Sequence, residues 1–148
     1  MKKIILIFSV FLFTSCTTYL MPIESFEEQF QNVNESSREE VKVRTPYYGI
    51  STKYLANTIN NITCFDKNNN SIILKNSPSI EIRITEKNEK KTIFYFDRVY
   101  LENSIVYGDK SRIPGFEKGI PLDSILKIEI QDGKKNFKYI ENDTSKQQ

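Results

Sequence analysis

Two cysteines, Cys16 and Cys64, are the strongest nucleophiles in this chain of 148 residues, and the sequence contains no histidine. A catalytic serine or cysteine needs a base that takes its proton, and histidine is the usual one. The sequence therefore excludes Ser-His-Asp and Cys-His catalysis, and it excludes zinc sites built on histidine. Cys64 lies in the apolar stretch of residues 62–65, so we expect a buried structural thiol there.

Cys16 follows a short apolar run. Lys2 and Lys3 precede residues 4–13, which are almost entirely apolar. A helix of this length spans about 15 Å, roughly half of the hydrocarbon core of a bilayer. A permanent transmembrane helix is therefore disfavoured, and residues 1–15 are predicted to be a cleaved signal peptide.

The residues Phe13-Thr14-Ser15-Cys16 resemble a lipobox, the processing site of bacterial lipoproteins. The resemblance implies that the Cys16 thiol carries a diacylglycerol with fatty acids such as palmitate. It also implies that Cys16 becomes the first residue of the mature chain, which the lipid then attaches to a membrane. Thr17 follows, not the aspartate that retains some lipoproteins in the inner membrane, which favours the outer membrane of a Gram-negative bacterium. Plain secretion and an uncleaved anchor remain the alternatives.

Charge is unevenly distributed along the mature chain. Without residues 1–15, the chain carries 19 basic and 19 acidic side chains. Residues 16–40 nevertheless hold six glutamates and only Arg38 as a basic residue. An acidic tether next to a mildly basic domain is soluble without any partner. The overall balance and the expected envelope location argue against a nucleic-acid partner.

The hydrophobic pattern predicts one β-rich domain over residues 41–142, followed by a polar tail over residues 143–148. Residues 16–40 are predicted to be an acidic tether that contains a short amphipathic helix, residues 21–33. The expected apolar face of that helix consists of Ile23, Phe26, Phe30 and Val33. This helix either docks on the domain or binds a partner. A second short helix is predicted to begin at Ser51.

Several short segments within the domain alternate as strands do. Residues 62–65 and 71–74 flank an asparagine-rich loop and predict a hairpin. Residues 80–84 predict a strand with one buried and one solvated face. Residues 93–101 are apolar on both faces around the pair Asp97-Arg98, which predicts a central strand or a bend at the pair.

The end of the domain carries its clearest turn. Asp132-Gly133 is typical of a type I′ hairpin and is expected to lead directly into a last strand with Phe137 and Tyr139. The sequence therefore predicts a mainly β fold, an antiparallel meander that forms a small barrel or sandwich, with a short N-terminal helix after the anchor. Residues 120–130 resemble the last part of β-rich domains in uncharacterised Gram-negative envelope proteins, which implies a closing strand and no activity.

Two surface sites are predicted. Phe116 lies in a glycine-flanked loop and is predicted to contact a partner, the alternative being that its ring folds under the sheet. Asp123-Ser124-Ile125 resembles a bacterial O-glycosylation motif, so Ser124 is a predicted acceptor if that turn is exposed. The Asn-rich loop after Asp66 matches only half of a calcium loop, so we expect no metal and no cofactor.

The sequence thus favours a non-catalytic cell-envelope lipoprotein whose β-rich domain binds or supports another envelope component. The alternative is a small carboxylate-dependent enzyme that acts on glycan or lipid, because glycoside hydrolysis needs paired acids and no histidine. Its acids would come from Asp97, Glu102, Asp123 and Glu129. Cross-strand ion pairs are the expected use of these carboxylates otherwise.

Overall fold

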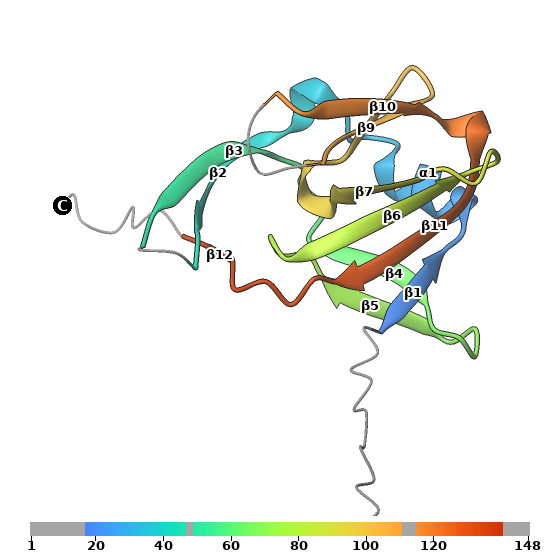
Figure 1. Cartoon of the computed structure of the whole chain (residues 1–148), viewed down its shortest axis with the longest axis horizontal. Helices are drawn as coiled ribbons and strands as arrows, with labels where there is room; N and C mark the ends of the chain where they lie inside the picture. Colours follow the sequence, from blue (N-terminus) through green and yellow to red (C-terminus); the bar gives the residue numbers. More distant parts are fainter. Residues whose placement is uncertain (1–16, 47–48, 111–114, 141–148) are drawn as a thin grey trace, which may run out of the picture.

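The structure, a computed structural model, describes residues 17–46, 49–110 and 115–140. Within these ranges the chain is mainly β, with antiparallel sheets and the short helix α1. The strands form a sandwich-like meander, which confirms the predicted fold class (Figure 1).

The largest sheet contains six strands in the order β5-β4-β1-β11-β6-β7. All of its pairings are antiparallel, and the predicted hairpin of residues 62–65 and 71–74 is confirmed as β4 and β5. The bounds are β1 Thr18–Met21, β4 Asn61–Phe65, β5 Ser71–Lys75, β6 Ile80–Glu86, β7 Lys91–Tyr95 and β11 Ile125–Asp132.

The four residues of β1 lie inside this sheet rather than in a tether. Thr18 pairs with Gln131 of β11, and Leu20 pairs with Phe65 of β4. The prediction of a tether is therefore wrong for residues 18–21, which form a strand of the domain. The predicted helix docks on the domain, which is one of its two expected outcomes. Residues 18–21 form a strand because the sheet satisfies their backbone hydrogen bonds on both edges.

The helix α1 (Ile23–Phe30) follows β1 directly and is shorter than predicted. Pro22 precedes it and accepts a hydrogen bond from the backbone N–H of Phe26. Phe26 and Phe30 are fully buried, and their rings stack with centroids 4.3 Å apart. The Gln29 amide exchanges two hydrogen bonds with the backbone of Thr63, of 2.9 and 3.0 Å, and so continues the ladder of β4 beyond the end of β1.

Two three-stranded sheets complete the fold, in the orders β10-β9-β8 and β12-β2-β3. Their strands are β2 Glu39–Arg44, β3 Ser51–Ala56, β8 Tyr100–Glu102, β9 Ile105–Asp109, β10 Glu117–Pro121 and β12 Lys138–Tyr139. The helix predicted to begin at Ser51 is wrong, because this segment pairs along its whole length with β2.

The hairpin predicted at Asp132-Gly133 is also wrong. The chain leaves β11 there, and β12 pairs with β2 in another sheet. Lys134, not Gly133, has the positive φ, and the backbone N–H of Gly133 bonds to Ser79. Tertiary pairing therefore replaces the local hairpin that the dipeptide favours.

The chain bends at Asp97-Arg98, one of the two predicted outcomes. The 3-10 helix η2 (Phe96–Arg98) separates β7 from β8, and both charged side chains are buried. Arg98 lies 3.1 Å from Asp109 and stacks on the Tyr54 ring at 3.8 Å. The Asp97 carboxylate accepts hydrogen bonds from the hydroxyls of Tyr54 and Tyr139. This network joins the two three-stranded sheets at the segment that follows β7.

The face of β6 that we predicted to be solvated is largely covered by a polar ladder. Lys135 and Gln131 both donate to Glu81, and Arg83 donates to Gln131 at 3.0 Å. Arg83 also pairs with Glu129, the residue opposite it on β11. Long polar side chains cover one another here, and Glu81 is buried among them opposite Tyr95 of β7.

Truncation of Phe30 tests whether α1 belongs to the core. We expect Phe30→Ala to lower the free energy of unfolding by about 3–5 kcal/mol, because the ring is fully buried and leaves a cavity. Phe116→Ala is the matched control and should change stability by less than about 0.5 kcal/mol, since its ring is exposed. Urea unfolding of both variants measures the difference. Equal, small effects would mean that the helix does not pack as described.

Candidate functional site

The predicted lipidation site, Cys16, lies outside the described residues. Thr17 is the first described residue, is exposed, and immediately precedes β1. Consecutive Cα atoms are about 3.8 Å apart, so the bond to Thr17 fixes where Cys16 is attached. The part of the domain that follows the predicted lipidation site directly is therefore the start of a strand in the largest sheet.

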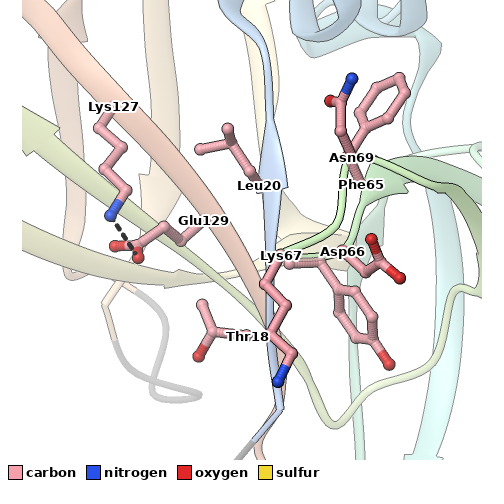
Figure 2. A pocket seen from close by; sticks show the side chains of 9 residues that line it. Thr18, Leu20, Phe65, Asp66, Lys67, Asn69, Lys127 and Glu129 are labelled. Carbon is pink, nitrogen blue, oxygen red and sulfur yellow. Dashed lines mark ion pairs between the residues drawn. The ribbon is translucent and has the colours of Figure 1, made fainter.

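A hollow of about 320 Å³ lies beside this start, on the face of the sheet where Leu20 points outward. Figure 2 shows its side chains, which come from β1, from β11, from the end of β4 and from the turn between β4 and β5. That turn lies next to Thr18 because β4 runs antiparallel to β1. The lining residues are Thr18, Tyr19, Leu20, Phe65, Asp66, Lys67, Asn69, Lys127 and Glu129.

Asp66 shapes the turn at one side of this hollow. Its side chain accepts a hydrogen bond from the Asn70 amide and others from the backbone N–H groups of Asn70 and Asn68. These hydrogen bonds lower the pKa of Asp66, and the bond from the Asn70 side chain has the largest effect. The carboxylate therefore stays ionised, and its oxygens cap their own turn, as an Asx turn does.

Glu129 lies at the other side of the hollow, between two cations. One of its carboxylate oxygens is 2.8 Å from the Lys127 amine, and the other is 3.8 Å from the Arg83 guanidinium. Figure 2 shows the contact with Lys127 at the edge of the hollow. Glu129 forms a cross-strand ion pair as expected, but with Arg83 where a lysine was expected; the lysine that it contacts, Lys127, lies on its own strand.

The opposite side of β1 opens into two further hollows that share Thr17 and Tyr19. Their volumes are about 570 Å³ and about 300 Å³. Half-buried apolar side chains, those of Tyr19, Ile72 and Leu74, form the floor. Three exposed lysines line the openings: Lys67, Lys75 and Lys134. We call the surface formed by the three hollows the N-terminal surface.

The four carboxylates considered for catalysis lie on four different elements: η2, β8, the 3-10 helix η3 (Leu122–Ser124) and β11. Asp97 is buried beneath two tyrosine hydroxyls, and Asp123 is exposed. Of the four, Glu129 alone lines the hollow beside Leu20, where its acidic neighbour is Asp66. A glycosidase pair needs one protonated acid, and the lowered pKa makes Asp66 unsuitable for that role.

Phe116 and Ser124 lie on separate parts of the surface. Phe116 directly precedes β10 and is 57% exposed, so the alternative that its ring folds under the sheet is wrong. Ser124 is half-buried in η3, and its hydroxyl donates to the carbonyl of Pro121 at 2.7 Å. Neither residue lines the N-terminal surface. Glycosylation of Ser124 stays a prediction.

The N-terminal surface was missed at the sequence level. The charge pattern of residues 16–40 predicts a tether and the apolar spacing of residues 21–33 predicts a helix, whereas the apolar pair Tyr19-Leu20 beside threonines favours a strand. Among the described residues, no cluster of acids or cysteines could hold a metal ion, and no helix is long and apolar enough to span a membrane.

Cys64 is fully buried on β4, as predicted. Burial raises the pKa of its thiol to about 11. We expect iodoacetamide to alkylate Cys64 slowly in the folded protein at pH 8 and rapidly in urea. Mass spectrometry of the modified peptide measures both rates. Fast modification of the folded protein would show that the thiol is accessible.

Because the pKa of the Cys64 thiol is higher in the folded protein than in the unfolded chain, the free energy of unfolding depends on pH. The folded thiol stays protonated above its ordinary pKa of 9.0, whereas the unfolded chain loses the proton. This contribution to stability is therefore present below pH 9.0 and declines as pH rises through about 11. We expect the free energy of unfolding, measured in urea, to be lower at about pH 11 than at pH 9.0. The decrease should be smaller in Cys64→Ala.

Comparisons with models of protein families, with curated proteins and with solved structures find no match to this chain.

Proposed function

We propose that the protein is a cell-envelope lipoprotein, anchored through Cys16, whose β-rich domain binds or supports another envelope component without catalysing a reaction. The observation that carries the proposal is the Phe13-Thr14-Ser15-Cys16 motif directly before the first strand of the domain. Processing at this motif would remove residues 1–15 and leave β1 complete, because β1 begins at Thr18. The outer membrane of a Gram-negative bacterium is the proposed location.

A binding role fits the chemistry of the described acids better than catalysis does. Asp66 caps a turn, Glu129 pairs with two cations, and Asp97 is buried in a tyrosine network. These carboxylates act as structural hydrogen-bond acceptors and ion-pair partners. Phe116 offers an aromatic side chain on the loop before β10, which is an edge strand of its sheet. Exposed aromatic side chains of this kind are frequent anchors at protein interfaces.

Metabolic labelling with palmitate tests the anchor. We expect wild-type protein to incorporate the label and Cys16→Ala to incorporate none, because the thiol is the attachment point. Cys64→Ala is the matched control, since it removes the other cysteine and should leave labelling unchanged. Labelling is read from the immunoprecipitated protein on a gel. Equal labelling of wild type and Cys16→Ala contradicts the lipoprotein assignment.

Cross-linking in cells tests the partner. We expect detergent extraction of the C-terminally tagged protein, followed by mass spectrometry, to recover one dominant envelope protein. Phe116→Ala should reduce that recovery several-fold, because truncation of an interface aromatic removes much of its binding energy. Leu126→Ala is the control, since Leu126 is as exposed as Phe116 but lies on β11. Unchanged recovery with Phe116→Ala removes this residue from the interface.

A further inference from the structure

The anchor proposed at Cys16 would leave almost no linker between lipid and domain. Thr17 alone separates Cys16 from β1, and β1 is hydrogen-bonded on both sides within the sheet. Two peptide units join Cys16 to Thr18 and reach at most about 7 Å, which is no more than about the thickness of the headgroup layer on one side of a bilayer. A lipid on Cys16 would thus bring the surface around Thr17 against the headgroups.

The residues around Thr17 suit such a contact. The hollows on the Tyr19 side have apolar floors, and Leu20 exposes an apolar side chain on the other side. Four of the five exposed charged residues that line the three hollows are lysines: Lys67, Lys75, Lys127 and Lys134, with Asp132 as the fifth. Lysines around apolar side chains are typical of surfaces that bind anionic lipids.

The acidic side chains that line the three hollows form hydrogen bonds or ion pairs with other groups of the protein. Asp66 is bonded to its own turn, and Glu129 is paired with Lys127 and Arg83. Asp132 accepts hydrogen bonds from Ser79 and from a backbone N–H. Lys67, Lys75 and Lys134 make no salt bridge with another described residue, although the charge of Lys67 acts on its neighbour Asp66. The four lysines of the lining exceed its three acids by one, so the surface carries a small positive excess.

We propose that the N-terminal surface is a membrane-contact surface that seats the domain on a bilayer containing anionic phospholipid, with Lys67 and Lys134 against the headgroups. This inference rests on the proposed anchor at Cys16. The domain then stands on the membrane in one orientation, with the turn between β6 and β7 pointing away. That turn lies at the opposite end of the sheet, because Ile80 pairs with Asp132 and Glu86 with Ile125.

A matched pair of labels tests the orientation. Asn68→Cys and Asn88→Cys place an environment-sensitive fluorophore in two exposed turns at opposite ends of the sheet. Along the strand direction the two turns lie about 20 Å apart, which is the length of the seven residues of β6. Buried Cys64 is expected to remain unlabelled. The mature lipidated protein is inserted into vesicles of phosphatidylethanolamine and phosphatidylglycerol that carry a headgroup nitroxide.

We expect quenching to be several-fold stronger at position 68 than at position 88. Lys67→Gln together with Lys134→Gln should weaken quenching at position 68, since each lysine favours the docked orientation by about fivefold near an anionic surface. Replacing phosphatidylglycerol by phosphatidylcholine should have the same effect. Lys90→Gln is the control, because Lys90 is an exposed lysine in the distant turn.

Two results overturn the proposal in distinguishable ways. Equal quenching at both positions, with diacylglycerol present on Cys16 by mass spectrometry, overturns the membrane-contact surface and leaves the anchor intact. An unmodified Cys16 in the mature protein overturns the anchor and the surface together.

Discussion

The pairing of β1 on both of its edges is the constraint on which the rest of the structure depends. On one side β1 pairs with β11, which continues to β6 and β7; on the other it pairs with β4, which continues to β5. A strand of four residues thus joins the two halves of the largest sheet. Because an unpaired strand edge leaves backbone groups unsatisfied, loss of β1 would separate the β4–β5 hairpin from the core. The same strand positions α1, whose stacked phenylalanines fill the space behind the sheet.

A second buried element, the pair Asp97-Arg98, holds the smaller sheets in place. Tyr54 of β3 donates to Asp97 with its hydroxyl and stacks under Arg98 with its ring, so one side chain serves both charges. Tyr139 brings β12 to the same carboxylate, and Asp109 of β9 neutralises the arginine. A buried ion pair such as Arg98–Asp109 contributes little net stability, but removal of one partner leaves an uncompensated charge. It therefore favours this arrangement of sheets over alternatives that would expose or unpair the charges.

The position of β1 also connects the fold to the proposed function. A flexible tether would let the domain move freely relative to a membrane, whereas a strand that begins two residues after Cys16 would not. Phe116 lies on the loop between β9 and β10, in a different sheet from β1 and outside the lining of the N-terminal surface. If the anchor is correct, contact with the membrane and contact with a partner use different surfaces. The domain could then bind both at once without competition.

The sequence by itself determined the elements whose signal is local: the hairpin of β4 and β5 and the alternation in β6. For residues 93–101 it left two outcomes, a central strand or a bend at Asp97-Arg98, and the tertiary structure decided for the bend. It also indicated the burial of Cys64, because the stretch around it is apolar. Only the tertiary structure decided that residues 18–21 form a strand, that Ser51 begins β3, and that β12 pairs with β2 instead of β11. Short strands carry too few residues for a clear period, and their pairing depends on partners far away in the chain. The N-terminal surface is not visible in the sequence for the same reason, because its lysines come from segments that only the assembled sheet brings together.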